Sequence, residues 1–507
     1  MKINSITIVG GGSAGWMTAA MLSKHLPEIK ISLIESEKIS TIGVGESTLQ
    51  YFNNYLNRMG LEDKDWMPYC NATYKTSIGF KNFKHGKGER FQYPFGTFNN
   101  PNPNQFFELQ LKYGKELYPD EDFANYVNYN TFISDTNRLP VIPNFKFGNF
   151  DFDFDTAYHL DAELFGKYLR DNICIPNGVN HIIGDVKKLN IRTDGHISSL
   201  LIEDGHLLES DLFVDCTGFK SLLLEKFMNV PYISFNDQLL NDRAISVKTP
   251  YNDVESEMLT YTDCVAMSAG WIWNIPLWHR FGRGYCYSSN HINESRAEIE
   301  FKNYLRQIYT SDEIDDFTFN HIQIRNGKHN IAWKKNCVAI GLSYGFLEPL
   351  ESTGLLTTHE TILNLCDTLL RRDRFISRID VDVFNNEVDN IMEGLKDFVA
   401  IHYALSQRSD TKYWRDCRDI FTCKNQLEKL NKFSLGSDGL LYIAAGFGWR
   451  PTNQISNANI DVFHEQWQTD KEELYNWMSI QPTHYQYLKE SIYSKEQKEI
   501  VKNIDKK

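Results

Sequence analysis

The first 35 residues constrain the fold most strongly, because they have the pattern of a strand, a glycine turn, a helix and a second strand. The apolar residues Ile6, Ile8 and Val9 predict a short buried strand. A G-x-G-x-x-G turn over 10–15 follows, and it opens an apolar helix over 16–26. A second apolar strand over 29–34 ends at Glu35, twenty residues after Gly15. Strand, turn, helix and acid therefore stand where a dinucleotide-binding βαβ unit requires them.

The glycine turn predicts contacts to an ADP-containing cofactor. Glycines let the backbone turn tightly and approach a pyrophosphate, whose charge is favoured at a helix N-terminus. The acid at the end of the second strand can accept hydrogen bonds from a ribose. An isolated glycine turn is a weak signal, but its context here favours dinucleotide binding. The predicted contacts are Gly10, Gly12, Ser13, Ala14, Gly15 and Glu35.

Composition excludes several classes of protein. The formal charge of −13, with no basic segment to offset it, argues against a nucleic-acid partner. Nine cysteines without a C-x-x-C pair indicate reduced, buried thiols rather than a disulfide framework or a metal site. The N-terminus runs directly into the first strand, and no apolar run approaches the ~20 residues that span a bilayer. We therefore expect a cytoplasmic protein with no membrane partner.

The chain returns to a nucleotide-type sheet three times, near 1–48, 184–218 and 337–354. The second return is the strand 212–215, and the third is the strand 337–340 that leads into Gly341. Such interleaving suits FAD better than NAD, because later crossings of the chain must reach the flavin, and no second G-x-G-x-x-G is present. We expect one composite unit over 1–507. Its FAD-binding part covers roughly 1–95, 150–225 and 325–375, and its substrate-binding part 96–149, 226–324 and 376–507.

Other segments carry more local expectations. The loop 41–48 contains Gly45, Glu46 and Ser47, and is either a turn with an N-cap or a second phosphate or flavin contact. A strand over 74–83 would carry Lys75, and an amphipathic helix is predicted over 158–172. The aromatic segment 91–154 is expected to form long loops, 247–289 an antiparallel sheet, and the chain after 375 mainly helices.

The sequence resembles the flavin-dependent halogenases of the tryptophan halogenase family, from Gly10 to about Pro451. Besides the glycine turn, the resemblance rests on these segments: the loop 44–48 (VGEST), the lysine in 72–78 (ATYKTSI), 158–161 (YHLD), 270–276 (GWIWNIP) and 346–354 (FLEPLESTG). The W-x-W-x-I-P hexapeptide is highly specific to that family. The resemblance implies an α/β fold of the FAD-binding Rossmann-like, GR2-type flavin monooxygenase-like class, with a mixed sheet and a mainly helical substrate-binding portion.

The resemblance also implies a reaction. In the family, reduced FAD and oxygen give a C4a-hydroperoxide, a halide attacks its distal oxygen, and the hypohalous acid travels along a tunnel to a lysine near the aromatic substrate. By resemblance, Lys75 is this lysine. Its ammonium could polarise the hypohalous acid by a hydrogen bond, or its neutral amine could form a haloamine. The alternative is an exposed lysine at a strand edge.

The last four residues of the last motif resemble further site residues. Glu351 resembles the carboxylate that receives the ring proton or aligns the hypohalous acid, and Ser352 the backbone link between the flavin and substrate sites. Thr353 and Gly354 resemble a halide cradle of backbone N–H groups at a helix N-terminus. Their ordinary role would be to start and cap that helix.

Alternation along a strand places Trp271 and Trp273 on one face and Ile272 on the other. These two tryptophans could simply be residues of the hydrophobic core. By resemblance, they fill space near the tunnel and prevent direct oxidation of the substrate, so that smaller residues there should raise the amount of hydroxylated product.

The segment Tyr93, Pro94 and Phe95 departs from the tryptophan-specific members, which have His in place of Tyr93. The Tyr-Tyr pair that grips free tryptophan in those enzymes has no counterpart, since the corresponding segment, 440–446, is LLYIAAG. We therefore expect a pocket for indoles, phenols or other electron-rich arenes, with chloride, bromide or iodide as the halide.

Three hypotheses remain open at this stage. The first is a halogenase that receives FADH2 from a separate flavin reductase, since no reductase domain is visible. The second is an FAD-dependent aromatic hydroxylase, and the third is a non-catalytic flavin-binding relative. Homologous enzymes are often homodimers, but the sequence shows no interface.

Overall fold

A computed structural model describes residues 1–38, 45–96, 106–109, 123–144, 146–147, 150–420, 436–449 and 460–494, with the side chains of 436–438 left aside. The chain forms two compact units that are interleaved in sequence. Unit 1 comprises 1–70, 160–242 and 323–396, and unit 2 comprises 71–159, 243–322 and 397–507. Within the described segments, no helix is both long and apolar enough to cross a membrane.

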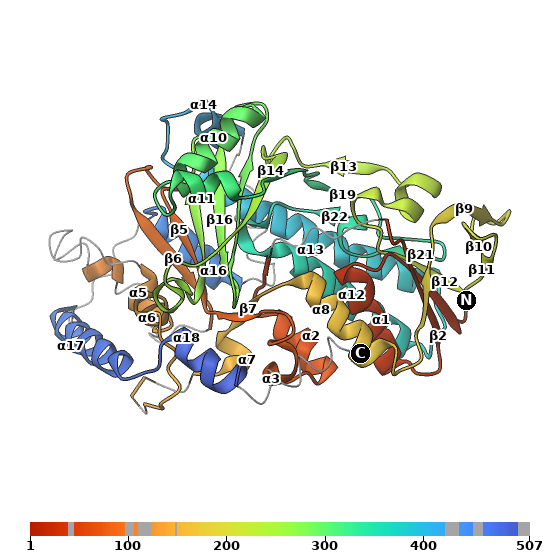
Figure 1. Ribbon diagram of the computed structural model, residues 1–507, viewed down its shortest axis with the longest axis horizontal. Helices are drawn as coiled ribbons and strands as arrows, with labels where there is room; N and C mark the ends of the chain where they lie inside the picture. Colours follow the sequence, from red (N-terminus) through yellow and green to blue (C-terminus); the bar gives the residue numbers. More distant parts are fainter. Residues whose placement is uncertain are drawn as a thin grey trace. The chain divides into compact units, whose positions relative to one another are not determined.

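Unit 1 is built on a six-stranded sheet whose strand order is β20-β21-β12-β1-β2-β8. Figure 1 labels β2, β12 and β21 of this sheet. Its strands are β1 Ser5–Val9, β2 Lys30–Glu35, β8 Asn180–Ile183, β12 Leu212–Asp215, β20 Trp333–Lys334 and β21 Cys337–Ala339. All pairings are parallel except that of β20 with β21. The strands of this sheet thus come from three distant parts of the chain, and all three predicted strand-to-glycine junctions belong to it.

Helices and smaller sheets complete unit 1. Helix α1 lies against both α8 and α12. Helix α2 ends at Gly60, whose left-handed backbone caps it. The helices and turns are α1 Ser13–His25, α2 Phe52–Met59, α3 Asp63–Trp66, α8 Ala162–Leu169, η1 Arg170–Cys174, η2 Gly218–Lys220, η3 Leu222–Phe227, η4 Gly341–Ser343, η5 Pro349–Glu351, α12 Thr353–Arg371 and α13 Arg378–Ala404, which continues into unit 2. The remaining strands are β3 Glu46–Ser47, β9 Val186–Ile191, β10 Ile197–Ile202, β11 Leu207–Leu208, β13 Tyr232–Ser234, β19 Gly327–His329 and β22 Gly345–Phe346.

Unit 2 is built on a seven-stranded mixed sheet of order β18-β14-β17-β16-β15-β5-β6. Its strands are β5 Ser77–Lys81, β6 Arg90–Pro94, β14 Arg243–Thr249, β15 Tyr261–Ala266, β16 Gly270–Pro276, β17 Phe281–Tyr287 and β18 Asn320–Gln323. The strands β14, β15, β16 and β17 form the antiparallel part that the sequence predicts, whereas β15 pairs with β5 in parallel.

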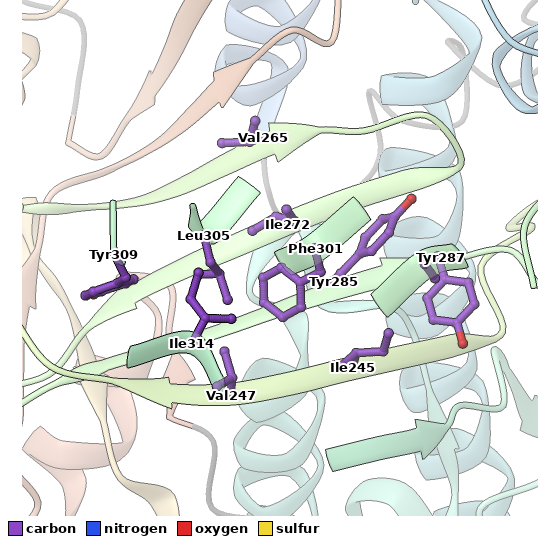
Figure 2. Packing of buried hydrophobic residues seen from close by; sticks show 11 residues of the cluster. Ile245, Val247, Val265, Ile272, Tyr285, Tyr287, Phe301, Leu305, Tyr309 and Ile314 are labelled. Atoms are coloured by element: carbon purple, nitrogen blue, oxygen red, sulfur yellow. The ribbon is translucent and has the colours of Figure 1, made fainter. Parts of the chain in front are cut away.

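One face of this sheet is covered by α10 Glu294–Leu305 and α11 Ser311–Asp316. Figure 2 shows Ile245, Val247 and Ile272 on the strands facing Phe301 and Leu305 of α10. Helix α11 begins with a capping box between Thr310 and Glu313. The other elements of unit 2 are β4 Thr73–Lys75, α5 Phe123–Val127, α6 Thr131–Thr136, α7 Phe152–Asp155, β7 Ala157–Leu160, α9 Val254–Glu257, α14 Lys412–Ile420, α16 Gly436–Gly446, α17 Ile460–Ser479, α18 His484–Tyr487 and η7 Leu488–Ile492.

Three local expectations are wrong in part. The helix predicted over 158–172 starts only at Ala162, because 157–160 form β7, which pairs with β4. The strand predicted over 74–83 is two strands, β4 and β5. The segment 91–154 contains the short helices α5, α6 and α7 rather than loops alone. Residues 97–105, 110–122, 145 and 148–149 of this segment, and 41–44 of the glycine-rich loop, lie outside the described residues.

Candidate active site

The glycine turn of unit 1 connects the end of β1 to the start of α1. Gly10 has φ +113°, and a Cβ there would lie 2.2 Å from the carbonyl oxygen of Cys216, at the end of β12. The Gly10 N–H donates to the carbonyl of Ile34 on β2 (2.8 Å). The turn is thus held between two strands of the sheet. The first turn of α1 carries no acidic residue, so its N–H groups present a favourable field to an anion.

Two side chains border this turn. Ser13 Oγ donates to the carbonyl of Ala162 (2.9 Å), which connects the start of α1 to the start of α8. Ala14 lies close to Gly341, since a Cβ on Gly341 would come within 3.0 Å of the Ala14 Cβ. The glycine turn after β21 therefore contacts the glycine turn after β1.

Glu35, at the end of β2, lies over the glycine turn. A Cβ on Gly11 would overlap its carboxylate, with Oε2 at 1.6 Å. Its Oε1 lies 2.6 Å from Nε2 of His181 on β8. No local sequence signal points to His181, because it meets Glu35 only through the pairing of β2 with β8.

Asp215 is a second residue that the sequence analysis did not single out. It ends β12, is fully buried, and accepts hydrogen bonds from Thr217 on Oδ1 and from the N–H groups of Leu223 and Leu224 on Oδ2 (2.7 and 2.9 Å). It thereby fixes the turn after β12, whose backbone packs on Gly10. The sequence signal that could have identified Asp215 is its position at the end of an apolar strand.

The N-terminus of α12 brings together the residues of the last motif. Ser352 has a left-handed backbone (φ 57°), and its Oγ donates to Ser47 Oγ of β3 (2.9 Å). Thr353 is the first residue of α12 and is 1% exposed, yet its Oγ1 has no hydrogen-bond partner among the residues described. Gly354 follows it. A Cβ there would lie 3.8 Å from Oε2 of Glu46, so β3 lies against the first turn of this helix.

Glu351 ends the short turn η5 and is fully buried. The residues before it are held by side-chain amides of the same unit. Asn241 Nδ2 donates to Oε2 of Glu348 (2.6 Å), and the Glu348 N–H donates to Oδ1 of Asn326 (2.7 Å). The backbone that carries Glu351 is therefore fixed before α12 begins.

Gly45 and Glu46 lie beside this helix start. Burial, with the nearby charge of Asp161, raises the pKa of Glu46 to about 7. Asp161 is the N-cap of α8, where its Oδ1 accepts from the N–H groups of Glu163 and Leu164. At neutral pH, Glu46 therefore holds a proton about half of the time.

In unit 2, Lys75 ends β4 and is fully buried, so it is not an exposed lysine at a strand edge. Its Nζ lies 5.1 Å from the ring centroid of Phe95, within cation–π range. The position of Phe95 is fixed by its backbone, because its N–H donates to the carbonyl of Thr76 (2.8 Å) and its carbonyl accepts from the amides of Asn128 and Asn130 (both 3.0 Å). The ammonium and the aromatic ring thus come from segments that are hydrogen-bonded to each other.

Further aromatic rings surround this pair. The Tyr93 ring lies 6.2 Å from that of Phe95, 6.2 Å from that of Phe398 and 5.8 Å from that of Tyr442 on α16. Pro94 ends β6 between Tyr93 and Phe95 and is buried. Unit 2 therefore joins the predicted lysine and the predicted substrate residues into one aromatic environment.

The lysine strand is held by a buried polar network. Thr73 Oγ1 donates to the carbonyl of Pro276 (2.6 Å), the last residue of the W-x-W-x-I-P motif, and lies 3.3 Å from Nδ1 of His159. Nε2 of His159 lies 2.9 Å from Thr262 Oγ1. The N–H of Tyr74 donates to Nε2 of His484 (3.1 Å). We call Thr73, His159 and His484 the lysine-strand clamp.

Both histidines of the clamp are neutral at pH 7. Nε2 of His484 accepts a backbone N–H, so its proton is on Nδ1, which faces the carbonyl of Met258 (3.0 Å). Burial lowers the pKa of His484 to about 4. Burial, followed by the charge of Lys75 and that of His484, lowers the pKa of His159 well below its usual value. The clamp adds no positive charge next to Lys75.

Trp271 and Trp273 lie on the face of β16 opposite Ile272, as alternation predicts, with ring centroids 6.0 Å apart. Trp273 pairs with Gly284 on β17, and a Cβ at 284 would lie 2.1 Å from Cζ2 of its indole. The indole therefore occupies the space that a side chain at 284 would need.

A model of the family described as tryptophan halogenase matches residues 5–481. This chain belongs to the tryptophan halogenase family. Among curated relatives, the halogenase is 35% identical over 434 residues to the 7-chloro-L-tryptophan 6-halogenase KtzR of Kutzneria sp. (strain 744), covering 82% of this chain and 81% of that protein. Its curated homologues include the tryptophan 7-halogenase RebH of Lentzea aerocolonigenes, at 32% identity over 452 residues, covering 86% of this chain and 82% of RebH.

Solved structures agree with this assignment. The halogenase matches the apo structure of VirX1 with a TM-score of 0.90 at 43% identity, covering 97% of this chain and all of the other. It matches the tryptophan 6-halogenase SttH from Streptomyces toxytricini with a TM-score of 0.84 at 30% identity, covering 96% and 99%. The protein is thus a flavin-dependent halogenase with the Rossmann-like FAD-binding fold, and a hydroxylase or a non-catalytic relative is not favoured.

Proposed function

We propose that this halogenase uses FADH2, O2 and chloride, bromide or iodide to form hypohalous acid, which Lys75 relays for electrophilic halogenation of an electron-rich arene, with Glu351 assisting. The observation that carries this proposal is the full burial of Lys75, 5.1 Å from the Phe95 ring, on a strand clamped by uncharged groups. Burying an ammonium is costly, so a buried lysine among aromatic rings is a candidate for chemistry rather than for stability.

The residues of unit 1 fit an FAD. Gly10, Gly12, Ser13, Ala14 and Gly15 would hold the pyrophosphate at the start of α1, and Glu35 would accept from the ribose. The second group of contacts would be Gly45, Glu46, Ser47, Gly341 and Ser352, which the structure connects to the first through Ala14 and Gly341. Bound and reduced FAD would supply two of the four electrons that reduce O2, and the halide, which is oxidised, would supply the other two, to give hypohalous acid and water. Thr353 and Gly354 would hold the halide, and the buried hydroxyl of Thr353, which has no hydrogen-bond partner among the described residues, supports this role.

The proposed substrate is an indole, a phenol or a similar arene. KtzR and SttH are named for tryptophan. By resemblance, this chain carries Tyr93 in place of the His of the tryptophan-specific members. The packing of Tyr93 on Tyr442 and Phe398 gives an aromatic lining that suits a ring substrate without a dedicated grip on an amino acid group. Trp271 and Trp273 would fill space and so limit direct oxidation of the arene. Reduced flavin would come from a separate reductase.

One experiment tests the assignment. FADH2 from a generic reductase, O2, bromide and a panel of indoles and phenols are supplied, and products are identified by the mass shift for bromine or for oxygen. We expect brominated arene from the wild-type protein and a loss of at least about 1,000-fold in Lys75→Ala, as for removal of a group that acts only in the transition state. Lys81→Ala, an exposed lysine on the neighbouring strand β5, is the matched control and should keep full activity. Halogenation at the wild-type rate in Lys75→Ala would refute the role of Lys75, and an oxygenated product alone would favour the hydroxylase.

A further inference from the structure

A carboxyl group lies beside the proposed halide cradle. Strand β3 is attached to the start of α12 by the hydrogen bond from Ser352 Oγ to Ser47 Oγ (2.9 Å). The neighbouring residue, Glu46, therefore lies against the first turn of the helix, with Oε2 3.8 Å from the position of a Cβ on Gly354. An acid beside the N-terminal N–H groups of a helix occupies the place that a bound anion would take.

The N-terminus of α12 can hold either the Glu46 carboxylate or a bound halide at low cost, but not both. Its first turn has no acidic residue of its own, and its N–H groups have no partner within the helix. The Thr353 hydroxyl is buried and without a hydrogen-bond partner in the part of the chain that the structure describes. A helix N-terminus with a buried donor that has no partner among the described residues is suited to an anion. Glu46 can provide the negative charge itself as a carboxylate. As a neutral acid, it can leave this place to a bound halide.

The surroundings of Glu46 favour its neutral form. Asp161, at the start of α8, is the charged group that acts on it, and it acts as a like charge. Glu351, in the turn before α12, is a fully buried acid of the same unit. Burial and the charge of Asp161 together raise the pKa of Glu46 to about 7.

We propose that Glu46 couples halide binding to proton uptake: as a neutral acid it admits the halide to the first turn of α12, and as a carboxylate it takes the halide's place and excludes it. This inference rests on the halide cradle at Thr353 and Gly354 in the proposed function. It adds Glu46, on β3, as a second determinant of halide affinity, and one that titrates with pH.

The coupling matches the proton balance of the reaction. Formation of hypohalous acid consumes one halide, one proton, FADH2 and O2 and gives FAD and one water, with the flavin oxidised and O2 reduced. The arene then exchanges its ring hydrogen for the halogen, and the displaced hydroxyl leaves with that hydrogen as a second water. One external proton is therefore needed for each halide, and protonated Glu46 allows both to bind together.

The expected size of the effect follows from linkage. If only the neutral acid binds halide, the apparent dissociation constant is multiplied by one plus the ratio of carboxylate to acid. With a pKa of about 7, bromide should bind about 10-fold more weakly at pH 8 than at pH 6. Glu46→Gln, which is neutral at every pH, should bind bromide with the same affinity across this range.

The test is bromide titration of the FAD-loaded protein by calorimetry at pH 6, 7 and 8, in two buffers of different ionisation enthalpy to count protons. We expect uptake approaching one proton per bromide at pH 8, and none in Glu46→Gln at any pH. Glu62→Gln is the control, because Glu62 is exposed in the same unit, and it should keep the wild-type pH dependence. FAD affinity is measured for each variant so that a loss of cofactor is not mistaken for a loss of halide.

The outcomes separate this inference from the proposed function. Bromide affinity that is constant from pH 6 to 8 while Thr353→Val weakens binding would overturn the role of Glu46 and leave the cradle intact. If bromide affinity in Glu46→Gln still depends on pH as in the wild-type protein, the role of Glu46 would be overturned and the cradle would again stay intact. Absence of bromide binding at every pH, together with absence of halogenated product, would overturn both.

Discussion

The substitution Gly284→Ala tests the packing of the W-x-W-x-I-P strand directly. A methyl group at 284 would lie 2.1 Å from Cζ2 and 2.4 Å from Cη2 of the Trp273 indole, and 2.7 Å from the carbonyl oxygen of Ile245. Carbon atoms in contact are about 3.5–4.0 Å apart. The buried indole must therefore move by more than about 1 Å, or the strands β14 and β17 must separate.

The magnitude follows from overpacking. Extra carbon in a filled core costs about 1–3 kcal/mol, and a rigid indole facing a backbone carbonyl places this site at about 3 kcal/mol. Trp273→Phe removes part of the indole and costs about 1–2 kcal/mol as a cavity. In the double variant the smaller ring makes room for the methyl group, so the two costs should fall short of additivity by about 1–2 kcal/mol.

The assay is urea unfolding of the two single variants and the double variant, with product analysis of the folded proteins. Gly184→Ala is the control, because its methyl group would meet only Ile34 Cδ1 at 3.9 Å, and it should change stability by less than about 0.5 kcal/mol. If Trp273 limits direct oxidation of the arene, Gly284→Ala should also raise the fraction of hydroxylated product. Additive free energies in the cycle, or wild-type stability in Gly284→Ala, would refute the reasoning.

Three further predictions follow from the same unit. Thr73→Val removes the hydroxyl that connects the lysine strand to Pro276, and should lower kcat about 10-fold with little change in KM; Thr73→Ser should restore the rate, and equal rates in all three proteins would contradict the clamp. Because the pKa of His484 is about 4 in the folded protein and about 6.5 in the unfolded chain, the unfolded chain takes up the proton at higher pH, and the free energy of unfolding should drop by about 2.5 kcal/mol between pH 7 and pH 4.5. His484→Asn should lack this component in urea unfolding at pH 7 and pH 4.5, and an identical pH dependence would contradict it. Trp271→Leu should increase the ratio of oxygenated to halogenated arene by mass spectrometry, and an unchanged ratio would count against the barrier role.

The sequence alone was sufficient to predict a structural feature wherever the residues that determine this feature are neighbours in the chain. The turn at Gly10, the start of α1 and the acid at Glu35 follow from spacing alone, because a tight turn and a helix N-terminus are made by consecutive residues. The shared face of Trp271 and Trp273 follows from strand alternation.

Only the tertiary structure decided the environment of each group. Residues 157–160 have a helical pattern but form β7, because pairing with β4 satisfies their backbone in a buried position. Lys75 is buried beside Phe95 through hydrogen bonds to Thr76, and His484 reaches the lysine strand from 410 residues away. Residue type and spacing are set by the chain itself. Burial, charge and hydrogen-bond partners arise only when distant segments exclude water from one another, and so the protonation of Glu46 and of the clamp histidines could not be predicted from the sequence.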